Sequence, residues 1–286
     1  KVMHKIYTNT YGNVTIDCPS EVEDGGSFTF KIATSTGAYR LAISQAGKNF
    51  RDFSWDDSQN ANVAKNITGT ILIEVVEHTE IMIGEERYML EECSAMLPPS
   101  QTQPTSSSIV LKSVVTAKGK HYSLNSYSGA YNRYANITSI TLPNNKYFIN
   151  PYAFSIQAGL TEIHAKAIDP KNYHIMEGAF GEKDLSGITL YVPAGSKADY
   201  AASTPWNQFK EILEEPLPKK YPVYVVGYGV ASTDAPDSIA RGQSLTVNIT
   251  LEPGFKSFEP SVITIPGEEV NKDVVIQVST HTENVL

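Results

Sequence analysis

The sequence predicts a mainly β protein in which two small β-sandwiches flank a short solenoid of repeats. Three observations lead to this prediction: a gapless similarity between the two ends of the chain, apolar alternation within both ends, and a longer repeat between them. The chain has 286 residues, which suffices for two or three domains of about 100–150 residues. Its hydrophobic share of 41% allows sizeable cores to be buried.

The first stretch of the terminal repeat, Tyr11–Gly37, aligns without a gap with Tyr228–Gly254. Nine positions are identical, among them three glycines at which the chain can reverse. Both copies then alternate apolar and polar residues, in Phe28–Ile32 and in Leu245–Ile249. A period of two with one apolar face predicts a half-buried strand.

Each copy ends on a further apolar strand, Thr70–Val75 in the first and Asp273–Val278 in the second. We therefore predict two related Ig-like β-sandwiches, over residues 1–98 and 221–286. The first contains an additional segment, Glu77–Leu97, to which the sequence assigns no structure. Leu97–Ser108 is rich in Pro, Ser, Thr and Gln and is typical of a linker or strap, and the proline-rich Glu214–Pro222 marks a second boundary.

The middle of the chain, residues 109–213, has a longer period. Ile140, Ile163 and Ile188 recur at intervals of 23 and 25, and two Ala-Phe pairs, at 153–154 and 179–180, recur at an interval of 26. Repeats of this length with Leu or Ile at short strands are typical of a leucine-rich repeat solenoid, in which each unit buries its apolar edge against the next.

The stretch LYVPAGSKADYAASTPWNQF, from Leu190 to Phe209, has the features of a cap on that solenoid. Pro193 ends a strand, and Ser196 is expected to cap a helix over Lys197–Ala202. Thr204-Pro205 offers a second helix start. Trp206 and Phe209 lie one helical turn apart, and we expect them to cover the last open hydrophobic layer.

The segments INPYAF…LTEI and IMEGAF…LSGITLYVP resemble the BspA-type leucine-rich repeat, which is common in secreted and surface proteins of gut and oral anaerobic bacteria. The resemblance covers Ile137–Ile212 and includes the closing segment. The array is short, with two clear units and a degenerate one before them, and Lys120–Tyr134 fits no repeat template. The flanking sandwiches resemble accessory modules of such proteins.

This resemblance implies a non-catalytic binding or adhesion protein that recognises a host extracellular protein or a glycan, on the bacterial surface or outside the cell. A carbohydrate-binding accessory protein of a glycan-utilisation system and a structural spacer are the alternatives. We expect a monomer without a cofactor. Because Lys1 begins directly on mature-looking sequence, an export signal or the lipid of a lipoprotein would have to precede it.

Composition and motifs exclude several classes of partner and chemistry. The net charge is −8 and basic tracts are absent, so nucleic acid and anionic membranes are poor partners. The longest apolar run, Val223–Val226, is too short to span a bilayer. No P-loop, nucleophile elbow or dinucleotide fingerprint occurs, and the six histidines are too dispersed for a helical metal pair. His164 and His174 are assigned to surface or turn packing, and a hydrolase with a dispersed site is the weakest alternative.

Three smaller features leave alternatives open. Asp56-Asp57 after Trp55 could bind Ca²⁺ or a sugar, or could form a polar connection with an aromatic turned into the sandwich. Glu85-Glu86 and Glu91-Glu92 are expected to be solvated charges. Cys18 and Cys93 could form a disulfide or be two buried thiols.

The best candidate for recognition is a tyrosine cluster among Ser, Asn and Gly: Tyr122, Tyr127, Tyr131 and Tyr134. Tyrosine offers a large contact area at a small entropic cost, which suits binding. The alternative is that these rings cover the open front of the repeat array.

Overall fold

The computed structural model describes residues 1–98, 101–131, 134–155 and 158–282. As the sequence predicts, the protein is mainly β. The chain divides into two compact units, Lys1–Glu80 with Leu90–Glu92, and Ile81–Met89 with Cys93–Leu286. The segment 77–97, expected to extend the first sandwich, is therefore shared between the units. Across the described ranges, no helix is long and apolar enough to cross a bilayer.

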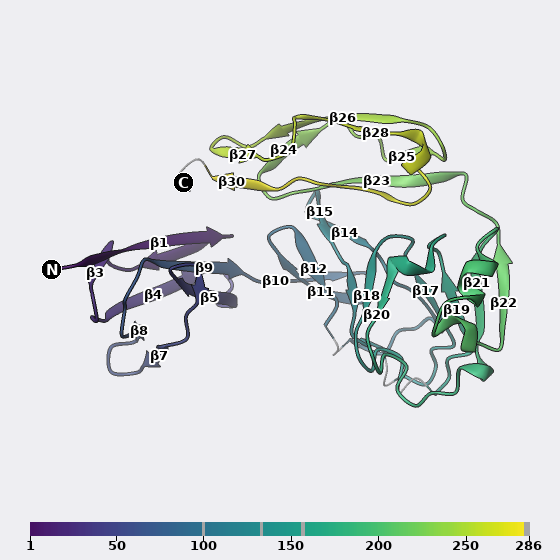
Figure 1. Ribbon diagram of the computed structural model, residues 1–286, viewed down its shortest axis with the longest axis horizontal. Coiled ribbons are helices and arrows are strands. Elements are labelled where there is room, and N and C mark those ends of the chain that lie inside the picture. Colours follow the sequence, from purple (N-terminus) through teal and green to yellow (C-terminus); the bar gives the residue numbers. More distant parts are fainter. Residues whose placement is uncertain (99–100, 132–133, 156–157, 283–286) are drawn as a thin grey trace. The chain divides into compact units, whose positions relative to one another are not determined.

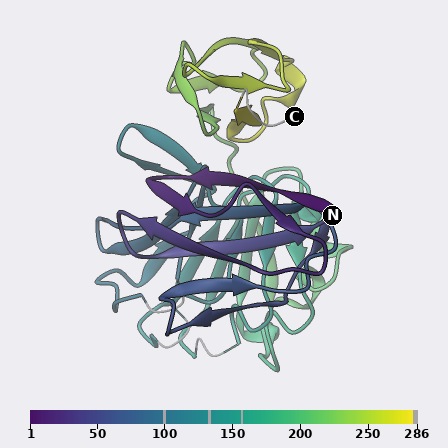
Figure 2. The same ribbon diagram turned by 90° about the vertical axis from the view of Figure 1, so that its left-hand side faces the viewer.

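The first unit consists of two facing sheets, with strand orders β3-β1-β9-β5-β6 and β2-β4-β8-β7 (Figures 1 and 2). Its strands are β1 Met3–Tyr11, β2 Val14–Asp17, β3 Glu21–Glu23, β4 Phe28–Thr34, β5 Tyr39–Gln45, β6 Lys48–Asn49, β7 Phe53–Asp56, β8 Ala61–Ala64 and β9 Ile71–Glu77. Alternation decides which side chains enter the core. Phe28 and Phe30 of β4 meet the buried Ile71, Ile73 and Val75 of β9 in one cluster.

Along the chain, the strands of a mixed sheet of order β10-β11-β12-β15-β14 come between β9 and the repeat region. Its strands are β10 Thr79–Ile83, β11 Glu86–Glu91, β12 Ser94–Met96, β14 Val114–Ala117 and β15 Lys120–Ser123. The predicted linker is held to this sheet as a strap: the buried Gln101 accepts from the Arg87 amide and donates to the Arg87 and Pro98 carbonyls. Pro99 and Ser100 of that linker lie outside the described residues.

Five parallel strands form the next sheet, in the order β13-β17-β19-β21-β22 (Figure 1). They are β13 Ser108–Val110, β17 Ser139–Leu142, β19 Glu162–Ala165, β21 Thr189–Pro193 and β22 Glu211–Glu215. Ile140 pairs with Ile163, and Ile163 pairs with Leu190. The equivalence drawn from sequence spacing, with Ile188 in place of Leu190, was therefore wrong. Ile188 instead ends a short 3₁₀ helix and is buried there.

A second set of parallel strands contains β16 Ser126–Tyr127, β18 Tyr147–Ile149 and β20 Tyr173–Ile175. The turns that follow repeat one backbone pattern: Gly129, Tyr152 and Gly178 all have positive φ, and each precedes an alanine and an aromatic residue. Tyr131 thus corresponds to Phe154 and Phe180. Part of the segment Lys120–Tyr134, expected to fit no repeat, therefore follows the same backbone pattern as the two units after it.

The predicted end segment folds largely as expected. α1, Lys197–Ala201, follows β21, and a 3₁₀ helix η3, Trp206–Gln208, follows Pro205. Trp206 and Phe209 are both buried, and Trp206 packs against the rings of Tyr173 and Tyr200. One detail was wrong: the Ser196 hydroxyl donates to the Pro193 carbonyl and makes no side-chain cap bond to the helix. The remaining 3₁₀ helices are η1 Pro170–Asn172, η2 Leu185–Gly187 and η4 Gly267–Glu269.

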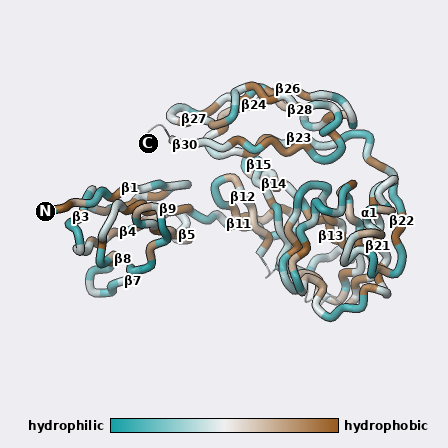
Figure 3. Tube along the Cα trace, viewed as in Figure 1, coloured by the Kyte–Doolittle hydropathy of each residue, from teal (hydrophilic) through white to brown (hydrophobic). Residues whose placement is uncertain are grey.

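The C-terminal segment has sheets of order β25-β23-β29 and β24-β26-β28, and a pair β27-β30. Its strands are β23 Lys220–Val226, β24 Val230–Thr233, β25 Ser238–Ala240, β26 Leu245–Leu251, β27 Phe255–Ser257, β28 Val262–Ile265, β29 Val274–Gln277 and β30 Thr280–Thr282. Hydrophobic stretches of β23 and β26 face one core (Figure 3).

The two ends of the chain share their strand pairing, as the internal repeat predicts. His4 of β1 pairs with Val22 as Tyr221 of β23 pairs with Ile239. These two pairs have the same offset as the gapless alignment of Tyr11 with Tyr228. Likewise, β1 runs parallel to β9 and β23 runs parallel to β29.

Candidate binding surface

The outward face of the five-stranded parallel sheet presents one continuous row of side chains. Register places Val110, Thr141, His164, Tyr191 and Leu213 side by side across β13, β17, β19, β21 and β22. They are outward because their chain neighbours Ile140, Ile163 and Leu190 are fully buried, and side chains alternate along a strand. The two ends of the row, Val110 and Leu213, are exposed.

The centre of the row is a stacked ring pair. The ring centroids of His164 and Tyr191 are 4.4 Å apart, and their planes differ by 6°. Glu215 orients the imidazole, because His164 Nδ1 lies within hydrogen-bonding distance of Glu215 Oε1, at 2.7 Å. The two rings therefore stack face to face on adjacent strands and form an ordered aromatic pair, here called the platform, whose ring edges a ligand can contact.

Charged groups border this platform. Glu215 also accepts from Lys166, and Glu162 Oε2 lies 3.5 Å from His164 Nε2. Burial by itself raises the pKa of Glu215, but the hydrogen bonds from Lys166 and His164 outweigh it and hold that pKa below its usual value. Glu215 is thus a carboxylate at neutral pH and keeps the imidazole in place.

A cavity of about 500 Å³ lies beside the row, at the C-terminal ends of the five strands. Val110 and Thr141 of the row and the charged pair Lys166 and Glu215 line it, together with Tyr224. Apolar walls with a few charged groups are characteristic of ligand sites. The platform and the cavity together bring aromatic and charged groups to one surface.

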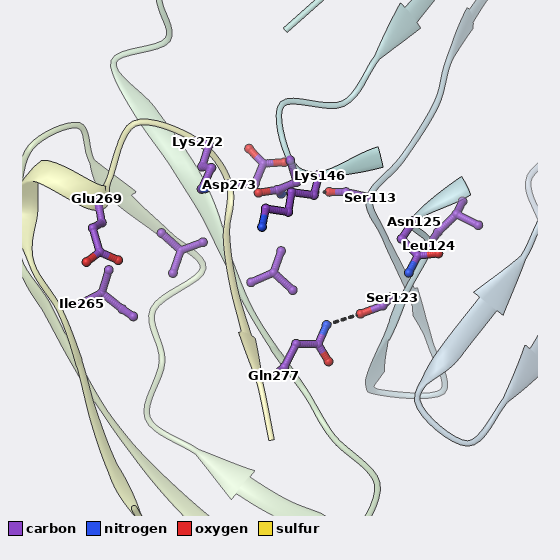
Figure 4. A pocket seen from close by; sticks show the side chains of 13 residues that line it. Ser113, Ser123, Leu124, Asn125, Lys146, Ile265, Glu269, Lys272, Asp273 and Gln277 are labelled. Atoms are coloured by element: carbon purple, nitrogen blue, oxygen red, sulfur yellow. Dashed lines mark hydrogen bonds between the residues drawn. The ribbon is translucent and has the colours of Figure 1, made fainter. Parts of the chain in front are cut away.

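A second cavity, of about 350 Å³, lies beside β29 (Figure 4). Gln277 of β29 donates to the Ser123 hydroxyl, and the amine of Lys146 is directed into the cavity toward β29 (Figure 4). Asn144 bonds Asp273 twice: its amide donates to Asp273 Oδ1 over 2.9 Å and its oxygen accepts from the Asp273 N–H over 3.1 Å. Burial raises the pKa of Asp273, against the hydrogen bond from Asn144.

The predicted tyrosine cluster does not form one exposed surface. Tyr127 and Tyr131 are buried, and the Tyr127 ring packs 5.4 Å from Phe154. Tyr131 donates to Glu86 over 2.8 Å, and Tyr134 donates to the Gln101 carbonyl over 2.6 Å. Tyr122 is half-buried on β15. The buried members therefore pack in the interior and are not available as one recognition surface; that they cover the open front of the array stays a prediction.

The acidic candidates serve local structure. Asp56 accepts from the amide and hydroxyl of Ser58 in the turn after β7, while the exposed Trp55 donates its indole N–H to Asp57. Glu86 was expected to be a solvated charge. It instead accepts from Lys112, Tyr88 and Tyr131, and these bonds hold its pKa low although burial alone raises it.

The remaining candidates hold no metal cluster and no disulfide within the described ranges. Cys18 is half-buried against the first core, where burial and the nearby Asp17 raise the pKa of its thiol.

Sequence reasoning missed the platform. His164 was assigned to packing, and Tyr191 was noted only within the end segment. The signal was present, since each repeat places a buried Ile or Leu directly before the outward residue: Ile140-Thr141, Ile163-His164 and Leu190-Tyr191. Only the strand pairing shows that these positions are neighbours.

No family model, curated protein or solved structure matches this chain.

Proposed function

We propose that this chain is a non-catalytic binding protein whose central segment is a short BspA-type leucine-rich repeat solenoid between two Ig-like β-sandwiches. The five parallel strands in register and the aromatic stack through Phe154 and Phe180, whose centroids are 5.1 Å apart, support the repeat assignment. The equal strand registers of β1 and β23 support two related sandwiches. The compartment we propose is the outer surface of a bacterium or the medium around it.

The single observation that carries a binding role is the outward platform of His164 and Tyr191. A row of aromatic, aliphatic and hydroxyl side chains, bordered by charges and adjoining a cavity, has the composition of a recognition surface. The ligand class we favour is a host extracellular protein, because the row spans all five strands and ends on the exposed aliphatic residues Val110 and Leu213.

A glycan is the second candidate, and one observation favours it. Aromatic rings with adjacent carboxylates, here Glu162 and Glu215 beside His164, suit a sugar that packs its apolar C–H groups against the rings and donates its hydroxyls.

The test is a binding screen of wild type against host extracellular proteins and a glycan array, repeated with Tyr191→Ala and His164→Ala. We expect each variant to weaken the detected binding at least about tenfold, which corresponds to the truncation of a central aromatic contact. The glycan array and the protein panel distinguish the two ligand classes.

The matched control is Phe148→Ala and His174→Ala. These residues form a second exposed aromatic and histidine pair, with centroids 5.1 Å apart, on β18 and β20. They lie on the other set of parallel strands, so their loss should leave binding unchanged. If both pairs of variants weaken binding equally, or if neither pair weakens it, the assignment of the platform is contradicted. If the screen detects no ligand at all, the structural spacer is favoured.

A further inference from the structure

The two related ends of the chain differ in one structural respect. In the first unit, β9 is paired on both edges, with β1 on one side and with β5 on the other. Its counterpart β29 is paired only with β23 and is the last strand of its sheet. The place that β5 occupies beside β9 has no strand beside β29 in the part of the chain that the structure describes.

The C-terminal segment has only a short strand where the first unit has β5. β27, Phe255–Ser257, follows β26 as β5 follows β4, and it pairs antiparallel with β30 just beyond β29. The Phe258 amide still donates to the Ser279 carbonyl over 3.2 Å, and its side chain is 77% exposed; the chain departs after this residue and continues to β28. Alongside Val274–Gln277, the position that Ala42–Gln45 fill in the first unit is therefore open.

Core side chains next to the open position are slightly more exposed than their counterparts in the first unit. Ile71, Ile73 and Ala64 of the first unit are each 0% exposed. By strand register, Val274 corresponds to Ile71 and Ile276 to Ile73, and their side chains are 6% and 4% exposed. Ile265 corresponds to Ala64 and is only partly buried. A strand in the open position would cover them as Ile43 of β5, 2% exposed, covers the first core.

The cavity of Figure 4 follows this open edge. Its lining includes the consecutive residues Asp273, Val274 and Val275, which point to opposite faces of β29. A cavity over one face alone would meet only every second residue. It also reaches Ile265 on the opposite sheet.

Backbone direction leaves hydrogen-bonding groups at the edge. The Val278 N–H donates to Val226 of β23, so by alternation the Asp273, Val275 and Gln277 amides point the other way. Asn144 already accepts from the first of these, the Asp273 N–H, as an added strand would. The amides of Val275 and Gln277 face the cavity.

We propose that this edge binds an extended segment of another protein chain, which adds antiparallel to β29 in the place that β5 fills beside β9. Main-chain hydrogen bonds to an open sheet edge supply affinity, and alternate side chains supply specificity. The proposal concerns a different surface from the platform of His164 and Tyr191.

The first unit shows which side chains the segment needs. Ile43 lies opposite Ile73, whose counterpart is Ile276, so the segment carries an aliphatic residue there. Ser44 lies opposite Leu72, whose counterpart is Val275, so the next residue points to the outward side of β29. Because the Lys146 amine is directed into the cavity that Val275 also lines, and no ion pair between it and a described carboxylate is seen, an acidic residue fits this position.

The probe is the chain's own β5 sequence, a labelled peptide of residues 38–46, made with Ser, Glu or Lys at position 44. Fluorescence anisotropy with the full chain measures its affinity. We expect the Glu peptide to bind most tightly and the Lys peptide most weakly, with a difference of about tenfold that shrinks as salt is added. The absence of peptide binding would overturn the proposal.

Two proline variants locate the binding site. Val275→Pro removes an edge amide and leaves the bonds to β23, so it should weaken the peptide at least about tenfold. Val262→Pro is the matched control: by its register with Asn248 its amide points away from β26, at the open edge of the other sheet. An unchanged affinity in Val275→Pro, or an equal loss in Val262→Pro, contradicts the assignment.

A charge reversal keeps the test decisive if a proline variant unfolds. Lys146 is exposed, so Lys146→Glu should leave the fold intact, as checked by circular dichroism. We expect it to reverse the order of the Glu and Lys peptides. The same order in both proteins would place the peptide elsewhere and overturn the proposal.

Discussion

At the scale of single residues, a buried carboxylate replaces backbone partners that the strands cannot supply. Glu77, at the end of β9, accepts from the amides of Asn13 and Thr36 and from the Ser35 hydroxyl, over 2.6–2.9 Å. It thereby joins the turn after β1 to the turn after β4. Gly12 has a φ of +89°, and a Cβ there would lie 2.7 Å from Glu77 Oε2, so only glycine permits this approach.

These bonds make the first unit sensitive to acid. Burial alone raises the pKa of Glu77, but the bonds from Ser35, Asn13 and Thr36 outweigh it and hold that pKa below its ordinary value. The stabilisation is therefore complete above the unfolded-state pKa of about 4.3 and is lost as the pH falls through the folded-state pKa.

Glu77→Gln should lower the free energy of unfolding by about 1–3 kcal/mol at pH 7, because an amide nitrogen then faces a buried backbone donor. The difference from wild type should shrink as the pH falls through the lowered folded-state pKa of Glu77, because wild type then also loses its charge. Urea unfolding at pH 7 and in acid measures both. Glu23→Gln is the control, since its partner Lys1 is exposed and the loss should stay below about 1 kcal/mol; a loss independent of pH would contradict the role of the Glu77 charge.

At the scale of elements, the repeats are held together by an aromatic ladder. Phe154 stacks on Phe180 with centroids 5.1 Å apart, Phe180 meets Phe209 at 5.8 Å, and Phe209 stacks on Trp206 at 5.9 Å. Each ring comes from a successive coil or from the end segment. The ladder ends on the buried Trp206 indole, at the place where the proposed solenoid would need a cover because its terminal unit has no further neighbour.

Trp206→Ala should lower the free energy of unfolding by about 3–5 kcal/mol, because it leaves a large cavity against Tyr173 and Tyr200. Denaturant unfolding followed by circular dichroism measures the loss. Trp55→Ala removes the other tryptophan, which is 53% exposed, and should change stability by less than about 0.5 kcal/mol. A loss below about 1 kcal/mol for Trp206→Ala would exclude the cap.

At the scale of the whole molecule, the division into units places a complete two-sheet core within Lys1–Glu80. Every strand of the sheets β3-β1-β9-β5-β6 and β2-β4-β8-β7 ends before Glu80, and the core cluster contains only residues of Ile6–Val75. The unit therefore contains all the apolar partners that its own strands need.

A fragment that spans Lys1–Glu80 should fold by itself, with a strand-type circular dichroism spectrum and one cooperative thermal transition. The same fragment with Ile73→Asp should be unfolded, because it buries an unpaired charge at a position that is 0% exposed. A wild-type fragment without a cooperative transition would mean that residues after Glu80, either Leu90–Glu92 of the same unit or residues of the second unit, complete its core.

The sequence by itself determined the β class, the duplication of the ends and the buried end segment. Alternation in Phe28–Ile32, the gapless similarity of Tyr11–Gly37 and Tyr228–Gly254, and the large rings of Trp206 and Phe209 are local or directly comparable properties. Such patterns can be read from the sequence without knowing which distant segments meet, because the burial of one face of a strand imposes the local alternation.

The tertiary structure alone decided which residues meet. Register placed Leu190, and not Ile188, opposite Ile163, and thereby joined His164 to Tyr191 although β20 lies between their strands in the sequence. It also turned Tyr127 and Tyr131 inward and left β29 without the neighbour that β9 has among the described strands. The physical reason is that strand pairing is a long-range choice: hydrogen bonds between distant segments fix it, and the local sequence of either strand does not contain it.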